Sequence, residues 1–342
     1  MRIAQIAPPW ITVPPTGYGG TEWVVQQLCD GLSERGHDVT LFASGDSHTA
    51  ARLRAVIPQQ MPNSIGVTAH EARHVTFALD EIIADGKFDL VHDHSGFLAV
   101  AFSKYLELPP ILHTIHCAFD DIAYPFYERF TKAVAYNAIS AYHQSQAPAG
   151  MNWAGVVHNA LDLEQWPFTP QKDDYLLAFG RVCADKGFHL AIEVARRTGH
   201  KLVMAGVVQK QNRAYFEERI APEIDDQIVY EGEVTDARKH ELFAHAKAFL
   251  FPIIWPEPFG LVMIEAMATG TPVIALREGS VPEVIADGHT GFIVETVDEM
   301  VAALARIDMI DPAACRRWVE DNFTVARMID GYEALYAKLL KL

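Results

Sequence analysis

Short apolar runs alternate with segments of helical periodicity along the 342 residues of this chain. Apolar runs bounded by turn residues predict buried strands, and apolar residues spaced three or four apart predict amphipathic helices. The predicted strands are residues 2–7, 38–43, 88–92, 110–115, 134–138, 154–157, 175–179, 201–205, 227–230, 247–251, 272–276 and 291–294. The predicted helices include residues 21–35, 71–85, 96–105, 186–197, 236–245, 260–268, 281–286, 297–305, 312–321 and 327–342. This alternation is typical of α/β folds, in which crossover helices cover parallel sheets.

The number of predicted strands indicates two domains. Twelve strands are more than one open, doubly wound sheet ordinarily holds, so we expect two such sheets. The best boundary is the segment 163–174, which contains two prolines and a charged run before a new strand begins at Tyr175. We therefore expect an N-terminal domain over 1–165 and a C-terminal domain over 166–326. The pattern alone leaves the helix over 327–342 free to pack on either domain.

The net charge of the chain limits the kinds of molecule that it is expected to bind. Lys plus Arg number 28 and Asp plus Glu number 44, which gives a net charge of −16. Nucleic acids and anionic membranes both require a positive protein surface, so the acidic balance argues against either as a partner. The four cysteines are widely spaced, with no C-x-x-C pair, which fits a reducing cytoplasm. No apolar stretch is long enough to predict a membrane-spanning helix or a signal peptide.

Two carboxylates flank the start of the helix predicted after Gly260. The backbone amides of Phe259, Gly260 and Leu261 would lie at its N-terminus, which is a favourable place for an anion. Glu257 precedes the helix and Glu265 lies more than one turn inside it. Beside an anion site, carboxylates suit the hydroxyls of a sugar and a ribose. A solvated helix face explains the same two carboxylates equally well.

Two cations follow the strand over 175–179, where the chain turns into a helix. Arg181 and Lys186 can converge on a diphosphate, Arg181 through a bidentate fork and Lys186 as a point charge. The alternative is a pair of surface salt bridges, for instance with Asp185.

A glycine loop joins the first predicted strand to the first predicted helix. Gly19 and Gly20 let a ligand approach the backbone beside a helix N-terminus. Glu22 stands where the dinucleotide fingerprint has its third glycine, so the loop differs from that motif. A plain turn with a cap is the alternative.

Four histidines lie at the ends of two predicted strands. They are His92 and His94 after one strand, and His113 and His116 after the other. A histidine in this position can hydrogen-bond a sugar hydroxyl or stabilise a developing charge. The alternatives are a metal site at His92 and His94, which share a strand face, and ordinary structural roles for at least two of the four.

The sequence contains no Asp-x-Asp pair. A divalent ion that carries a nucleoside diphosphate usually needs such carboxylates. We therefore expect no metal, with Arg181, Lys186 and backbone amides neutralising the phosphates.

Taken together, these motifs resemble the retaining glycosyltransferases of family 4, and the resemblance covers nearly the whole chain. The residues that carry it are Glu257 and Glu265 as an E-x7-E motif, Arg181 and Lys186 as the cation pair, Gly19 and Gly20 as the glycine loop, and the strand-end His116. Weaker similarities lie at residues 158–162, 231–234, 279–283 and 288–292. The resemblance implies a GT-B fold, in which two Rossmann-like parallel-sheet domains face a central cleft. It also implies that the helix over 327–342 packs back on the N-terminal domain.

The resemblance also implies a role for each motif. Glu265 would bind the ribose, Glu257 the donor sugar, and Arg181 with Lys186 the leaving diphosphate, without a metal or other cofactor. The implied donor-binding set is Gly19, Gly20, Arg181, Lys186, Val234, Glu257, Phe259, Gly260, Leu261 and Glu265, and the implied catalytic set is Glu257, His116, Arg181 and Lys186. The leaving phosphate itself would take the proton of the acceptor as the acceptor attacks from the front side.

The acceptor is expected in the N-terminal domain, near Tyr18, His94 and His116. The segment 17–23 looks like a subgroup that includes antibiotic-decorating enzymes, and the helix over 71–85 is acidic, where members that glycosylate lipids often have a basic one. The acidic helix and the net charge favour a soluble acceptor. The residues do not identify the base of the donor, and we expect a UDP-sugar such as UDP-glucose. The rival functions are a nucleotide-sugar epimerase of the same architecture and a non-catalytic nucleotide-sugar-binding subunit.

Overall fold

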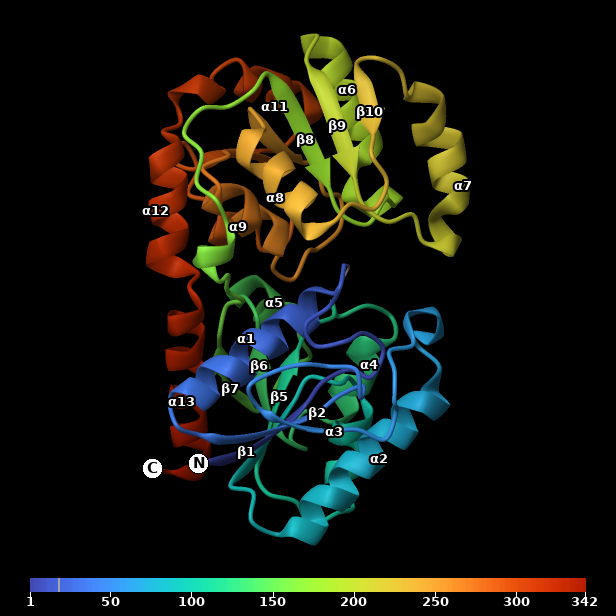
Figure 1. Ribbon diagram of the computed structural model, residues 1–342, viewed down its shortest axis with the longest axis vertical. Coiled ribbons are helices and arrows are strands. Elements are labelled where there is room, and N and C mark those ends of the chain that lie inside the picture. The colour runs from blue at the N-terminus through green and yellow to red at the C-terminus, as the bar shows by residue number, and fades with distance from the viewer. Residues whose placement is uncertain (18) are drawn as a thin grey trace. The chain divides into compact units, whose positions relative to one another are not determined.

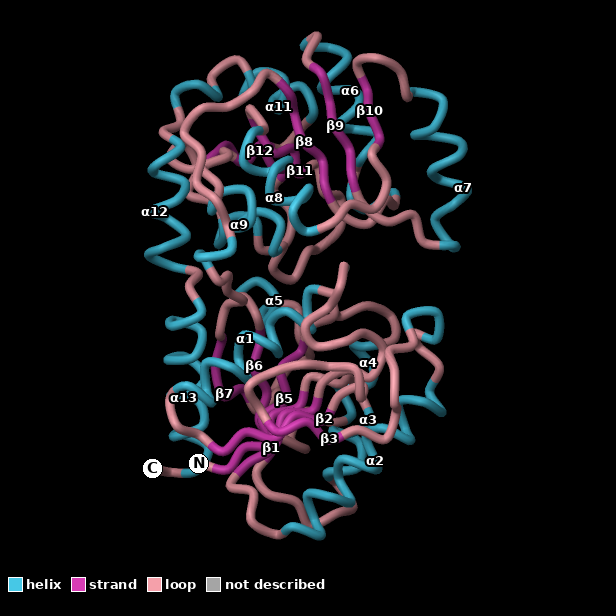
Figure 2. The backbone as a smooth tube through the Cα atoms, in the orientation of Figure 1, coloured by secondary structure: helices cyan, strands magenta, loops and turns pink. Residues whose placement is uncertain are grey.

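The computed structural model describes residues 1–17 and 19–342, and it divides into two compact units (Figure 1). The N-terminal unit contains Met1–Ala160 together with Val325–Leu342, and the C-terminal unit contains Leu161–Thr324. Each unit is built on one parallel sheet with helices on its faces, so the α/β class expected from the sequence is confirmed (Figure 2).

The sheet of the N-terminal unit has the strand order β3-β2-β1-β4-β5-β6-β7. Its strands are β1 (Arg2–Ile6), β2 (Asp38–Phe42), β3 (Arg52–Arg54), β4 (Leu90–Asp93), β5 (Ile111–Ile115), β6 (Ala135–Ala138) and β7 (Trp153–Val156). Its helices are α1 (Gly20–Glu34), α2 (Thr68–Asp85), α3 (Leu98–Ser103), α4 (Ala123–Arg129), α5 (Ala141–Ser145) and α13 (Val325–Leu340). The strand order reverses at β1 and β4, and in parallel sheets ligands bind beyond the carboxyl ends of strands at such a point.

Two hydrophobic cores hold this unit together, one on each face of the sheet. On one face, α1 and α13 bury an apolar stripe that includes Leu28 and Tyr332 against Ile3 of β1. On the other face, α2, α3 and α4 pack residues such as Leu79 against Ala4, the next residue of β1. Successive side chains of a strand point to opposite faces, and since both faces are covered, the strands are mostly apolar, with a few buried polar residues such as Gln5 and Asn137.

The sheet of the C-terminal unit has the strand order β10-β9-β8-β11-β12-β13. Its strands are β8 (Tyr175–Phe179), β9 (Lys201–Ala205), β10 (Ile228–Tyr230), β11 (Ala248–Phe251), β12 (Val273–Leu276) and β13 (Gly291–Val294). Its helices are α6 (Phe188–Thr198), α7 (Arg213–Tyr215), α8 (Asp236–His245), α9 (Leu261–Ala268), α10 (Val281–Val284), α11 (Val297–Leu304) and α12 (Pro312–Asn322). Because β8 lies between β9 and β11, the loops after these three strands meet at one edge of the sheet.

Every strand predicted from the apolar pattern overlaps an observed strand, and the structure adds β3. That strand is a three-residue edge strand of sequence Arg-Leu-Arg, too short and too polar to produce an apolar run. The short helices α4, α5 and α7 are also additions, because lengths of 7, 5 and 3 residues give too few turns to show a period.

Candidate functional site

The loops after β8 and β11 pack tightly against each other in the C-terminal unit. The backbone amide of Ile254 donates to the carbonyl of Asp185 at 2.9 Å. Gly187 has a left-handed φ of 68°, and a side-chain carbon there would lie 1.9 Å from the carbonyl oxygen of Pro252. Only glycine fits this position, so the loop that carries Lys186 is held against the loop that carries Glu257.

Lys186 and Glu257 form a mostly buried ion pair at this junction. The Nζ atom of Lys186 hydrogen-bonds Oε2 of Glu257, and the indole Nε1 of Trp255 donates to the same oxygen at 2.6 Å. The ammonium group also lies 5.4 Å from the ring centre of Trp255 and 5.9 Å from that of Phe251, within range of cation–π attraction. Glu257 is therefore fixed in place by two donors before any ligand arrives.

The helix α9 begins directly after this pair. Its cap residue, Gly260, has a left-handed φ of 79° and offers no side-chain cap. The backbone of Glu257 is held from the other side, because its carbonyl accepts a hydrogen bond from the amide of Ser280 at 3.0 Å. The N-terminus of α9, with Phe259, Gly260 and Leu261, thus follows Glu257 immediately, as the sequence predicts.

Glu265 projects from the second turn of α9 into a second carboxylate–lysine pair. Its Oε1 accepts from Nζ of Lys239 on α8 at 2.6 Å, and this ammonium group lies over the rings of Trp166 and Phe179. The other oxygen, Oε2, is buried and has no hydrogen-bond partner among residues 1–17 and 19–342. Buried carboxylate oxygens are almost always hydrogen-bonded, so this atom marks a place for a ligand hydroxyl.

Arg181 lies in the loop after β8, where three strand-end loops converge. Its Nε is buried without a hydrogen-bond partner in the described part of the chain. The amide of Val182 donates to Val207 at 2.9 Å, and the amide of Gly206 donates to Gly232 at 2.8 Å. The segments predicted to surround the base, Val207 and the loop from Gly232 to Val234, therefore sit beside the loop of Arg181.

Sequence reasoning missed three residues of this site: Lys239, Trp166 and Trp255. Lys239 is 26 residues away from Glu265 along the chain, so only the fold brings the two together. Trp255 is two residues from Glu257, and an indole so near a predicted site carboxylate was a signal in the sequence.

In the N-terminal unit, the glycine loop leads into α1. A side-chain carbon at Gly19 would lie 2.6 Å from Cβ of Pro15 and 3.0 Å from Oε2 of Glu22, so the loop has no room for one. Gly20 is the first residue of α1, and Glu22 is buried in its first turn. Burial raises the pKa of Glu22 to about 7. Tyr18, the predicted acceptor contact, lies outside the described residues.

The four strand-end histidines have different surroundings. His92 bonds the Tyr336 hydroxyl at 2.7 Å and Thr114 at 2.8 Å, while His113 bonds Asp93 at 2.6 Å and the Tyr127 hydroxyl at 2.8 Å. Both ring nitrogens of each are thus used within the fold. Within the described ranges, no three His, Cys, Asp or Glu side chains are arranged to hold a metal ion.

His94 and His116 form a pair at the carboxyl ends of β4 and β5. His94 Nδ1 lies 2.9 Å from His116 Nε2, and His94 Nε2 lies 3.1 Å from Oε1 of Gln5. His94 is buried, whereas His116 is only half-buried. Burial lowers the pKa of His94 well below its ordinary range and that of His116 to about 3, so both rings are neutral.

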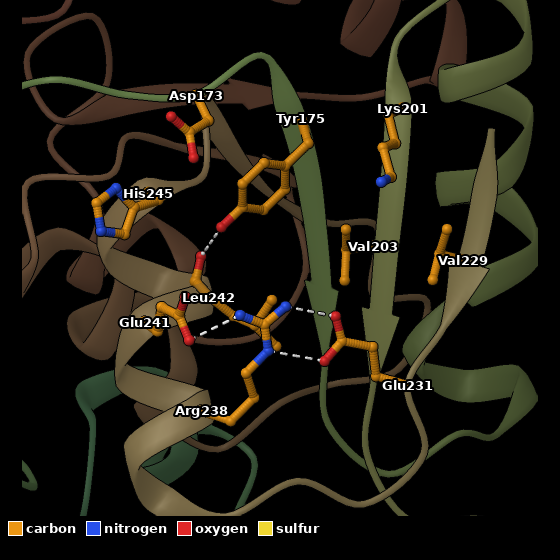
Figure 3. Close-up of a pocket in the computed structure, with 10 residues that line it drawn as sticks. All are labelled: Asp173, Tyr175, Lys201, Val203, Val229, Glu231, Arg238, Glu241, Leu242 and His245. Carbon is orange, nitrogen blue, oxygen red and sulfur yellow. Dashed lines mark hydrogen bonds and ion pairs between the residues drawn. The ribbon is translucent and has the colours of Figure 1, made fainter. Parts of the chain in front are cut away.

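The C-terminal unit also contains a pocket of about 350 Å³ between α8 and the strands β8, β9 and β10 (Figure 3). Figure 3 shows Arg238 between Glu231 and Glu241, and it pairs with Glu231 at 2.7 and 2.9 Å and with Glu241 at 2.7 Å. None of the predicted site residues lines this pocket, and its one guanidinium group is already neutralised.

Comparison with known proteins matches a described family to each unit of the chain. The family described as glycosyl transferases group 1 matches residues 163–323, and the family described as glycosyltransferase family 4 matches residues 18–165. The chain is a family 4 glycosyltransferase. The two matches together span both units, and the resemblance predicted from the motifs is confirmed.

Relatives of this glycosyltransferase align along most of its length. The phosphatidyl-myo-inositol mannosyltransferase of Mycolicibacterium smegmatis is 26% identical and covers 90% of this chain and 84% of its own. The crystal structure of AviGT4, a glycosyltransferase involved in avilamycin A biosynthesis, is 26% identical, with a TM-score of 0.72 over 100% of this chain and 98% of its own. Anabaena HepE, solved with UDP and glucose, is 18% identical, with a TM-score of 0.73 over 97% of this chain and 98% of its own. These neighbours confirm the GT-B fold.

No helix in the described part of the glycosyltransferase is both long and apolar enough to cross a membrane.

Proposed function

We propose that this glycosyltransferase moves a hexose from a UDP-sugar, such as UDP-glucose, to a hydroxyl of a soluble acceptor, with retention of anomeric configuration and without a metal ion. The observation that carries the donor half is the buried Oε2 of Glu265 on α9, which has no hydrogen-bond partner among the described residues, together with the ion pair of Lys186 and Glu257 just before the same helix. A nucleoside diphosphate sugar supplies both a ribose hydroxyl for the first group and a charged diphosphate with a hexose for the second.

In the proposed reaction, the donor binds to side chains that the fold already holds in place. Lys186 and Arg181 neutralise the diphosphate, together with the backbone at the start of α9. Glu257, held by Trp255, accepts a hydrogen bond from the hexose. Glu265 accepts one from the ribose, and the backbone near Val234 contacts the base.

The transfer step conserves atoms and charge. The bond between C1 of the hexose and the phosphate oxygen breaks, and the acceptor oxygen forms a bond to C1 on the same face. The acceptor proton passes to the leaving phosphate oxygen. Arg181 and Lys186 stabilise the charge that develops on that phosphate, which is the main electrostatic contribution of the chain.

UDP is favoured as the donor nucleotide because HepE, which shares the fold, is solved with UDP and glucose. The soluble acceptor is favoured by charge. The chain carries a net charge of −16, and the helix α2 contains four carboxylates, Glu71, Asp80, Glu81 and Asp85. The mannosyltransferase relative acts on phosphatidyl-myo-inositol, so a lipid acceptor is the competing expectation.

The first test is thermal stability without metal against UDP, GDP, ADP, CMP and a panel of UDP-sugars. A ligand at 100 times its Kd stabilises by about 2.7 kcal/mol and raises the Tm by a few degrees. We expect the rise with UDP, its loss in Lys186→Ala, and its retention in Lys104→Ala, an exposed lysine of the N-terminal unit.

Product analysis then separates the possible reactions. A glycoside of retained configuration with released UDP supports the proposal, and a C2-epimerised UDP-sugar with no glycoside supports the epimerase reading. Transfer to vesicle-borne phosphatidylinositol but to no soluble acceptor would overturn the acceptor assignment.

A further inference from the structure

We propose that Gln5 and His94 are positioning residues that fix the tautomer of His116. Tyr336 of α13 holds Gln5 in its orientation. As a result, His116 carries its proton on Nε2, and its Nδ1 can accept a hydrogen bond from a substrate hydroxyl. The inference rests on the proposed function for its substrate, whereas the tautomer itself is a property of the free protein.

His116 after β5, His94 after β4 and Gln5 of β1 form a hydrogen-bond relay. Each group in this order donates to the next. The Oε1 atom of Gln5 can only accept, so the protonated Nε2 of His94 donates a hydrogen bond to it at 3.1 Å. The Nδ1 atom of His94 is then unprotonated, because a neutral imidazole carries one proton. It therefore accepts from His116 Nε2 at 2.9 Å, and Nδ1 of His116 is left with a lone pair.

The orientation of the Gln5 amide decides the direction of the relay. Its Nε2 donates to the Tyr336 hydroxyl at 3.3 Å, and that hydroxyl lies 2.7 Å from Nδ1 of His92. When Tyr336 donates to His92, its oxygen accepts from Gln5, which leaves Oε1 of Gln5 for His94. Reversing the amide would reverse every donor along the relay and put the proton of His116 on Nδ1.

In the part of the chain that the structure describes, His116 Nδ1 is the open end of the relay formed by Gln5, His94 and His116. Both nitrogens of His94 and both polar atoms of the Gln5 amide are used. His116 is half-buried, and its Nδ1 has no hydrogen-bond partner among the described residues. Both rings are neutral because burial lowers the pKa of His94 and His116, so a lone pair on Nδ1 persists through the neutral pH range.

The test compares two buried tyrosines of α13, of which Tyr336 bonds Gln5 and Tyr332 does not. Tyr336→Phe removes the hydroxyl that orients Gln5. Tyr332→Phe removes a hydroxyl that bonds Thr114 and Asn137, each at 3.3 Å, and does not contact Gln5. The readout is the pair of imidazole ¹⁵N shifts of His116, which distinguish a protonated from a bare nitrogen in the whole, unliganded protein.

We expect a bare Nδ1 and a protonated Nε2 for His116 in the wild type and in Tyr332→Phe, and a mixture of tautomers in Tyr336→Phe. His94→Asn keeps an amide oxygen near the position of Nδ1 and should preserve the tautomer, whereas His94→Leu should lose it. A wild-type His116 protonated on Nδ1, or a His94→Leu variant with an unchanged tautomer, would overturn the proposal.

Kinetics connect the tautomer to turnover. We expect kcat/KM to fall about tenfold in His94→Leu and less in His94→Asn, while the UDP-induced rise in Tm stays unchanged, because the proposed nucleotide contacts are in the C-terminal unit. Altered tautomers with unchanged kcat/KM would refute the link to the substrate. Absence of any transfer by a wild type with the expected tautomer would instead count against the proposed donor or acceptor.

Discussion

The polar centres of the two units are built on opposite principles. In the C-terminal unit, two carboxylates are each paired with a lysine, and each lysine lies over two aromatic rings. In the N-terminal unit, burial lowers the pKa of the strand-end residues His92, His94 and His116, and these neutral rings bond to one another, to an amide and to a tyrosine hydroxyl. The charged centre suits a diphosphate, and the neutral one suits hydroxyl groups.

The two carboxylate–lysine pairs also differ from each other. Oε2 of Glu257 takes two donors, Lys186 and Trp255, whereas only one oxygen of Glu265 has a partner in the described part of the chain. The fold therefore orients the carboxylate of Glu257, and it leaves one oxygen of Glu265 able to accept a hydrogen bond from a ligand. Preorganised charge of this kind costs no rearrangement during the reaction, which is where electrostatic catalysis gains most.

The largest effect on turnover is expected from Glu257→Gln. An amide of the same size cannot neutralise Lys186, so both the placement of the lysine and the contact to the hexose are lost. We expect kcat to fall by about 100-fold or more with the fold intact. Glu193→Gln, an exposed carboxylate on α6, is the matched control and should be unchanged. Near-normal transfer by Glu257→Gln would remove this residue from the site.

A smaller effect is expected from Lys239→Met. Removing the lysine leaves a mostly buried carboxylate with neither oxygen paired, which typically costs about 3 kcal/mol and lowers the Tm by several degrees. The double variant with Glu265→Gln should recover part of that stability, because the uncompensated charge is gone. Calorimetry of both, beside Lys104→Met, measures the effect. An unchanged Tm in Lys239→Met would mean that the ion pair between Lys239 and Glu265 does not stabilise the fold.

The strands and the loops after them were predictable, whereas the partners across the fold were not. The apolar runs at β8 and β11 stand out because both faces of the sheet are covered, and their ends locate Lys186 and Glu257. The strand order, which makes these two strands neighbours, depends on tertiary packing. The contact between Lys239 and Glu265 follows from that order and from the crossing of α8 over the sheet.

The four strand-end histidines show the same limit of prediction from sequence. The pattern places all four at strand ends, yet their environments differ with the strand face and with residues distant in sequence. His92 meets Tyr336, which is 244 residues away, and Gln5 is separated from Tyr336 by 331 residues. No local period records such contacts, so the division of the histidines between structure and site had to come from the fold.

Acid–base behaviour gives the next test, on the glycine loop of the N-terminal unit. Burial raises the pKa of Glu22 from its ordinary value of 4.5 to about 7. The folded state therefore binds this proton more tightly than the unfolded chain does, and stability is lost as pH rises from about 4.5 to about 7, by about 3 kcal/mol. Glu22→Gln should flatten this part of the profile. The difference in the free energy of unfolding between wild type and variant, measured from pH 4.5 to pH 8, isolates Glu22 from the histidines, and a constant difference would contradict the raised pKa.

The smallest expected effect is that of a chelator, and it tests whether fixed cations do the work in the C-terminal unit. Lys186, Arg181 and the start of α9 are proposed to neutralise the diphosphate, so EDTA should leave the initial rate within a factor of about two. The matched experiment adds Mg²⁺ or Mn²⁺ to chelated enzyme, where we expect no gain for wild type. A strict requirement for either ion would transfer the charge-stabilising role from these side chains to a metal. The contrast between the charged C-terminal centre and the neutral N-terminal centre would then hold for the free protein and not for the enzyme with its donor bound.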